Sequence, residues 1–178
     1  MSQSINKTPD EEQKCMIVKA PTIYLPSQHR KTIFLAGSIA SAIDWRVALS
    51  SYLSHCPITL LDPYRRDWDS TWVEDIECEK FRTQTQWELE MQEKATLVAF
   101  WFEPGTQAPV SLLELGLVLG KRGANARKEV VVRCPEKYWK RGNVQVVCER
   151  YGVQIVNSFE EFCVELKRRL EGSGVEAE

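Results

Sequence analysis

The sequence has few histidines, no paired cysteines and no long apolar run. Its 178 residues include two histidines and six cysteines, and the cysteines stand singly, without a C-x-x-C pair or a histidine at ligand spacing. This pattern argues against a zinc site and for reduced thiols in an intracellular protein. The N-terminal segment lacks the apolar region of a signal peptide, and no run approaches the roughly 18 apolar residues of a membrane span. We therefore expect a cytoplasmic or nuclear protein with no metal and no membrane partner.

An excess of either charge is also missing. The formal net charge is -2 and the isoelectric point is about 5.8, which offers no basic surface for a nucleic-acid polymer. The chain contains neither G-x-G-x-x-G nor the Walker lysine, so a dinucleotide or triphosphate cofactor is not expected. A chain of this length can still bury roughly two-thirds of its unfolded surface, enough for one domain with a core and a pocket.

Short apolar runs alternate with helical patterns between two polar ends of the chain. The strand-like runs are residues 32–36, 58–61, 95–102, 129–133 and 153–156, and the helical patterns start at Asp44, 79, Ser111, Asn143 and Ser158. This alternation predicts an α/β fold with a doubly wound, five-stranded parallel sheet of flavodoxin-like order 2-1-3-4-5 and helices on both faces. The domain is expected to span residues 31–171, after an N-terminal extended arm (1–30) and before a flexible tail (172–178).

Ligands of such sheets bind beyond the carboxyl ends of the strands. After the first strand, Gly37 and Ser38 either let a ligand approach backbone N–H groups or simply form a tight turn. After the second strand, "LLDPYRRDWDSTW" places arginines beside tryptophans, which can hold a planar ring or an anion, although such charges also pair among themselves in a solvated loop. The candidate binding residues of this loop are Asp62, Arg65, Asp67 and Trp68.

The helical segment "QTQWELEMQEKA" carries one apolar stripe and two polar residues beside it. Trp87, Met91 and Ala95 recur at a spacing of four, and Glu88 and Gln92 are offset to the side of that stripe. We include Trp87 among the candidate binding residues. Glu88 either reaches a pocket or is an ordinary surface charge.

A single carboxylate, Glu114, stands in the otherwise apolar "APVSLLELG". Ser111 and Glu114 match the S-x-x-E capping box, and the helix dipole favours a carboxylate there. The same position follows the third strand at the ligand-binding edge, where that dipole would help to keep a buried carboxylate ionised and nucleophilic. Both interpretations of Glu114 remain open at this point.

Five motifs together carry a resemblance to a known family. They are "IFLAGSI", "LDPYRRDWDSTW", "FRTQTQWELE", "FWFEPGTQAPVSLLELG" and "YWKRGNVQVVCERYGV", and from about residue 32 to 156 the chain resembles the nucleoside 2-deoxyribosyltransferase family, in particular its nucleoside 2-deoxyribosyltransferase-like branch. The resemblance implies that Glu114 is a nucleophile. It would attack C1′ of a 2-deoxyribonucleoside, expel the base and hold a deoxyribosyl ester until another base or water takes the sugar.

The resemblance also implies the other parts of the site. Retaining glycosyl chemistry needs a second acid/base group, and the acidic residue of the preceding helix corresponds to Glu88, with Glu103 as a further carboxylate after the third strand. The asparagine after the fourth strand corresponds to Asn143, which family members contribute to a neighbouring subunit. This implies a homo-oligomer, a dimer or larger. Asn143 also fits a plain helix N-cap.

Three positions depart from the pattern of the family. Phe34 stands where a tyrosine often holds the catalytic carboxylate, and phenylalanine has no hydrogen-bond donor. Ala40 stands where the nucleotide-hydrolase branch has an arginine for a 5′-phosphate, a role left to Arg65 or Arg66. Ala108 stands where transferases place an acid, which leaves protonation of the base to Glu103, Glu88, Asp62 or water.

The main hypothesis is therefore an enzyme of nucleotide metabolism that takes a small-molecule nucleoside or nucleobase, a glycosyltransferase or a nucleoside hydrolase, without a cofactor. The alternative is a catalytically silent nucleoside- or nucleotide-binding module with a regulatory role, supported by Phe34 and Ala108. A thiol enzyme using Cys134 is a third hypothesis, which lacks a partner histidine or second cysteine.

Overall fold

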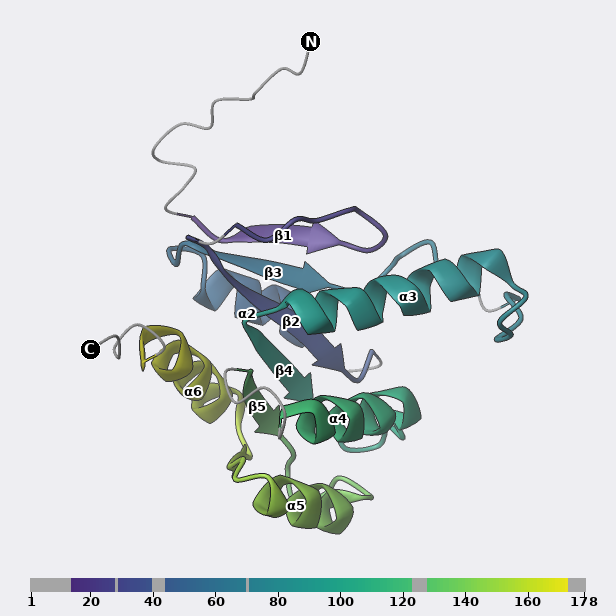
Figure 1. The fold of residues 1–178 in the computed structure, drawn as a ribbon. Coiled ribbons are helices and arrows are strands. Elements are labelled where there is room, and N and C mark those ends of the chain that lie inside the picture. Colours follow the sequence, from purple (N-terminus) through teal and green to yellow (C-terminus); the bar gives the residue numbers. More distant parts are fainter. Residues whose placement is uncertain (1–13, 28, 40–43, 70, 123–127, 173–178) are drawn as a thin grey trace.

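A sheet of six parallel strands runs through the described part of the chain (Figure 1). The computed structural model describes residues 14–27, 29–39, 44–69, 71–122 and 128–172. The strand order is β1-β3-β2-β4-β5-β6. The strands are β1 (Met16–Lys19), β2 (Lys31–Gly37), β3 (Ile58–Asp62), β4 (Leu97–Trp101), β5 (Glu129–Arg133) and β6 (Ile155–Val156).

The expected α/β fold with a parallel sheet is confirmed, but the five-strand count is wrong. The additional strand is β1, which lies inside the expected N-terminal arm and pairs with β3, placing Lys19 opposite Asp62. The order 2-1-3-4-5 holds only for β2 to β6, and β1 extends the sheet beyond β3. A run of four residues is a weak strand pattern, and the pairing partner of this strand lies about forty residues away in sequence.

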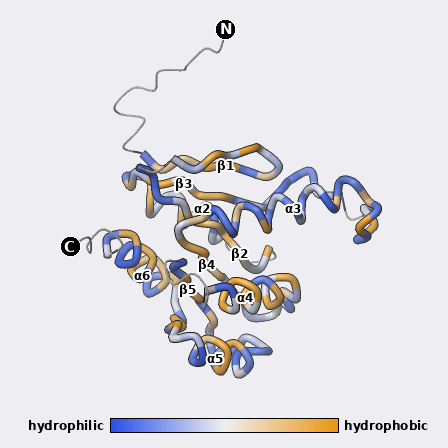
Figure 2. The backbone as a smooth tube through the Cα atoms, viewed as in Figure 1, coloured by the Kyte–Doolittle hydropathy of each residue, from blue (hydrophilic) through white to orange (hydrophobic). Residues whose placement is uncertain are grey.

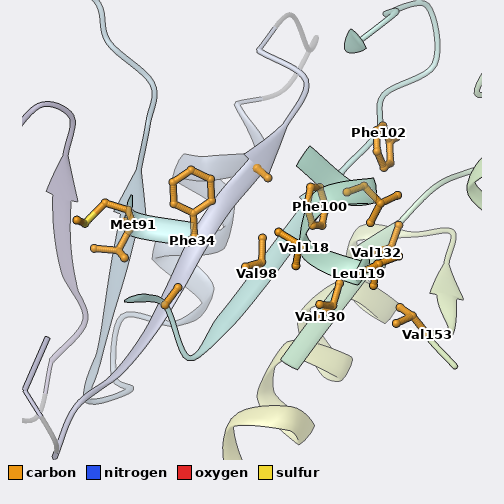
Figure 3. Packing of buried hydrophobic residues seen from close by; sticks show 14 of the residues in the cluster. Phe34, Met91, Val98, Phe100, Phe102, Val118, Leu119, Val130, Val132 and Val153 are labelled. Atoms are coloured by element: carbon orange, nitrogen blue, oxygen red, sulfur yellow. The ribbon is translucent and has the colours of Figure 1, made fainter. Parts of the chain in front are cut away.

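Helices cover both faces of the sheet. Successive residues of a strand point to opposite faces, and the strands carry buried apolar side chains on both of them. Phe34 and Ala36 of β2 pack with α3 (Glu79–Lys94), α4 (Pro109–Arg122) and α5 (Arg141–Arg150). Ile33 and Leu35 pack with α2 (Trp45–Tyr52) and α6 (Phe159–Gly172) on the other face. Figure 3 shows the first of these clusters, with Phe34 beside Met91 of α3.

Two helices begin earlier than the sequence pattern predicts. The helix α4 begins at Pro109, whose fixed φ suits a first helical position, and the Leu112 N–H donates to the Ala108 carbonyl oxygen at 3.1 Å. The helix α5 begins at Arg141, with Lys140 as its N-cap residue. Ser111 and Asn143 therefore lie inside first turns, and the alternative in which they cap these helices does not hold.

The two helices that carry the candidate carboxylates differ in polarity. Figure 2 shows that α4 is mostly hydrophobic, whereas much of α3 is hydrophilic. On the buried side of α3, however, the side chains include Gln84, Trp87, Met91 and Gln92. Among the residues described, no helix is long and apolar enough to cross a bilayer.

Candidate active site

The Glu114 side chain points from α4 toward α3. Glu114 is the sixth residue of α4, in the second turn, and its Oε1 accepts a hydrogen bond from Nε2 of Gln92 on α3. The carboxyl group is partly buried. Its position excludes the capping box, since the side chain contacts a neighbouring helix and Ser111 is not the N-cap residue.

Burial, and to a smaller extent the negative charge of Glu88, raise the pKa of Glu114 to about 8. The hydrogen bond from Gln92 and the positive charge of Arg46 lower this pKa, but they do not offset the burial. Burial thus opposes the ionisation that the helix dipole was expected to favour. The surroundings of Glu114 therefore favour its neutral form more than water does.

Glu88 comes from α3 and is the second carboxyl group of this site. Its Oε1 accepts a hydrogen bond from Gln84 Nε2 at 2.8 Å, and burial raises its pKa, while the Gln84 hydrogen bond and the Arg46 charge lower it. Two carboxyl groups with raised pKa values, from two adjacent helices, are an arrangement suited to general acid–base chemistry.

Arg46, which the sequence analysis missed, contacts the carboxyl ends of β2 and β3 beside Glu88 and Glu114. Its side chain is 7% exposed, and its Nη1 and Nη2 donate to the carbonyl oxygens of Ser38 at 3.1 Å and Gly37 at 3.2 Å. Its Nε lies 3.3 Å from Asp62 Oδ1, an ion-pair contact without hydrogen-bond geometry. The only available signal was an arginine near the start of a helix that follows the first expected strand.

Asp62 is buried at the carboxyl end of β3 and is held from three sides. Lys19 Nζ donates to its Oδ2 at 2.9 Å, the Tyr64 N–H donates to its Oδ1 at 3.0 Å, and Arg46 forms the ion pair described above. The structure thus places Asp62 in a network of charges at the edge of the sheet.

The contacts at the end of β2 explain why Gly37 and Ser38 occur there. Gly37 has a φ of 133°, and a Cβ atom there would lie 2.2 Å from the Trp101 carbonyl oxygen. The buried Ser38 hydroxyl lies 2.7 Å from Thr106 Oγ1 and accepts a hydrogen bond from the Glu103 N–H at 3.1 Å. These contacts tie the end of β2 to the loop after β4, and this loop leads to α4.

The loop after β3 forms its own cluster. Arg65 pairs with Asp67 at 2.6 Å and lies over the ring of Trp72, whose centroid is 4.9 Å from that of Trp68. The ion pair between Arg65 and Asp67 agrees with the alternative interpretation of this loop, in which its charges pair with each other. Trp68 is 40% exposed and keeps an open aromatic surface.

Two further candidates contact other parts of the protein. Glu103 accepts hydrogen bonds from Trp101 Nε1 at 2.8 Å and Arg133 Nη1 at 2.9 Å. Trp87 is buried beside Phe34, with ring centroids 6.3 Å apart, and its Nε1 donates to the Thr22 carbonyl oxygen at 2.8 Å. Trp87 is therefore part of the core beneath Glu88.

Asn143 is exposed beside an apolar groove between α4 and α5. The groove has a volume of about 290 Å³ and is lined by Leu112, Leu115, Gly116, Lys140, Asn143, Val144 and Val147. Of the remaining candidates, Ala40 lies outside the described residues. Cys134 is buried, which raises the pKa of its thiol to about 11 and opposes a thiolate nucleophile. No cluster suited to a metal ion occurs in the described ranges.

The fold and the site define a class of protein: a doubly wound α/β domain with a pair of acidic residues on adjacent helices beside the carboxyl edge of its sheet. The family model described as "Nucleoside 2-deoxyribosyltransferase like" matches residues 30–138. The chain belongs to this family. No curated protein matches the chain significantly.

Proposed function

We propose that this protein cleaves or exchanges the N-glycosidic bond of 2-deoxyribonucleosides through a covalent intermediate on Glu114. The observation that carries this proposal is the placement of Glu114 and Glu88 on α4 and α3, in one partly buried site where the charge of one acts on the other. The matched family supports the substrate class. The carboxylate pair supports a retaining reaction, with one carboxylate as nucleophile and the other as acid/base group.

The reaction starts from the protonated form of Glu114. Its proton passes, with Glu88 as the carrier, to the departing base as the bond between C1′ and the base nitrogen breaks. The Glu114 carboxylate forms the ester bond to C1′, and the base leaves with the electron pair of the broken bond. A second base or water then attacks C1′ and gives up a proton, and the ester bond breaks to restore the carboxyl group.

Replacement of Glu114 tests this proposal. Glu114→Gln and Glu114→Ala should abolish turnover of deoxyinosine, and Glu90→Gln provides the control, since Glu90 lies on α3 in an exposed pair with Lys94. Incubation with deoxyinosine and free adenine separates the two reactions, because transfer gives deoxyadenosine and hydrolysis gives free deoxyribose. Turnover by Glu114→Ala would show that the proposal is wrong. Binding of nucleosides without any product would favour the silent module.

We further propose that a second copy of the chain covers α4 and α5. Val110, Leu113 and Leu117 form an exposed apolar stripe on α4, and Val146 of α5 and Trp139 just before it expose further apolar surface. The mass measured by light scattering should be that of a dimer or larger. Leu113→Glu should shift it toward the monomer, and a wild-type monomer would contradict this proposal.

A further inference from the structure

Two buried glutamines on α3 contact the two carboxyl groups in the same way. Gln84 and Gln92 lie eight residues apart, with Glu88 midway, so all three lie along one side of the helix. Gln84 Nε2 donates to Glu88, and Gln92 Nε2 donates to Glu114. Both glutamines are 3% exposed.

An amide in such a place costs free energy unless its polar atoms are satisfied. The Oε1 atoms of both glutamines have no hydrogen-bond partner among the residues described. The hydrogen bond that the structure gives the Gln92 side chain is the one that its Nε2 donates to Glu114.

We propose that Gln92 is the positioning residue of Glu114, and this rests on the function proposed above. The Nε2–H group donates to the carboxylate and fixes the direction in which Glu114 points. The free Oε1 is available to accept the proton of the neutral carboxyl group. A side-chain amide holds both a donor and an acceptor, so Gln92 can hold Glu114 before and after it gives up its proton.

The backbone at Gln92 is itself held in place. Lys128 Nζ donates to the carbonyl oxygens of Gln92 at 2.6 Å, Glu93 at 2.8 Å and Ala95 at 2.6 Å. A cation at these terminal carbonyl groups stabilises the last turn of α3. Gln92 is therefore fixed at both its backbone and its amide, as a positioning role requires.

The charged groups that act on Glu114 are Glu88 of α3 and Arg46 of α2. Gln92 adds the hydrogen bond, which favours the ionised carboxylate and lowers the pKa of Glu114. Loss of the amide removes this contribution and leaves both charges in place. The ionisation of Glu114 therefore reports on Gln92 without any need for turnover.

The test is a carbon NMR titration of the glutamate carboxyl groups in the full-length protein, with Glu114 assigned from Glu114→Gln. In Gln92→Met, which keeps the side-chain length but has no donor, the midpoint of Glu114 should rise by about one to two pH units. Because the proposed reaction starts from protonated Glu114, the pH at which kcat/KM falls should also move upward by about one to two pH units. Gln92→Leu is a second donor-free variant in case the first does not fold.

Gln84→Met is the matched control, because it removes the same kind of hydrogen bond from Glu88. It should raise the midpoint of Glu88 and leave that of Glu114 unchanged or lower, since a neutral Glu88 no longer repels Glu114. An unchanged Glu114 midpoint in Gln92→Met, or an equal rise in Gln84→Met, would overturn the role of Gln92. If the midpoint rises as expected but Glu114→Ala still turns over substrate, the proposed function fails and the positioning contact stands.

Discussion

The charge of Glu88 on α3 raises the pKa of Glu114 on α4. Both groups are partly buried, and each accepts a hydrogen bond from a glutamine of α3. A carboxyl group with a raised pKa can supply a proton, and the same group becomes a nucleophile once the proton has left. The pair thus gives Glu114 both states that the proposed reaction uses.

The first prediction concerns the pH dependence of turnover. Because the reaction starts from protonated Glu114 and uses its proton, kcat/KM should fall as pH rises through a midpoint near the Glu114 pKa of about 8. Glu88→Gln removes the neighbouring negative charge, so the midpoint should move to lower pH even as the rate falls. Initial rates between pH 5 and 9 measure both effects. A midpoint that moves upward in Glu88→Gln would contradict the coupling of the two carboxyl groups.

The second prediction concerns stability. An acid whose pKa is higher in the folded protein contributes stability at low pH, and this is lost as pH rises from its unfolded value of 4.5 to about 8. Glu114→Gln removes the titrating group and therefore does not lose this stability as pH rises. The free energy of unfolding of Glu114→Gln minus that of the wild type should be larger at pH 8 than at pH 5, by up to about 3 kcal/mol. Urea unfolding at both pH values measures this difference. A gain that is equal at both values would mean that Glu114 titrates normally.

The sequence S-x-x-E occurs twice among the described residues and has two outcomes. At Ser158, the Glu161 N–H donates to the serine hydroxyl at 3.1 Å and the Glu161 carboxylate accepts from the Ser158 N–H at 3.2 Å, which is a capping box. At Ser111 the motif lies inside a helix that begins at Pro109. Because α4 begins at Pro109, two residues before Ser111, Glu114 lies in the second turn and its side chain points toward α3. The local motif alone does not distinguish these cases.

The third prediction compares two glycines with positive φ. Gly37→Ala should lower the free energy of unfolding by about 3 kcal/mol or more, since its Cβ would meet the Trp101 carbonyl oxygen. Gly105→Ala should cost only about 1 kcal/mol, because Gly105 has a φ of 82° but open space around it. Thermal or urea unfolding separates them. Equal losses would show that backbone conformation, and not the close approach of β2 and β4, requires Gly37.

The fourth prediction concerns the two cations beside Asp62. Arg46→Met leaves this buried carboxylate without its buried partner and removes two hydrogen bonds to strand-end carbonyl groups, so we expect a loss of about 3 kcal/mol or more. Lys19→Met should cost about 1 kcal/mol or less, because the Lys19 side chain is 54% exposed. Denaturant unfolding of both variants tests this. Similar losses would contradict the assigned importance of Arg46.

The sequence predicts much of the fold and less of the site. Five strands are marked by apolar runs, whereas β1 needs a distant partner to form. The resemblance points to Glu114 and Glu88, but Arg46 and Gln92 act through contacts between elements that are far apart in sequence. Neither belongs to a short motif. The raised pKa of Glu114 could not be predicted from the sequence either, because burial and a neighbouring carboxyl group depend on how α3 packs against α4.

The central claim is that Glu114 forms a bond to the sugar. Incubation with a 2-fluoro nucleoside analogue, followed by digestion and mass spectrometry, tests it directly, because such an analogue slows release of the intermediate. We expect the mass of the fluorinated sugar on the peptide that contains Glu114, and no adduct on that peptide in Glu114→Gln. An adduct on another residue, or release of the base without any adduct, would contradict the assignment of Glu114 as the nucleophile.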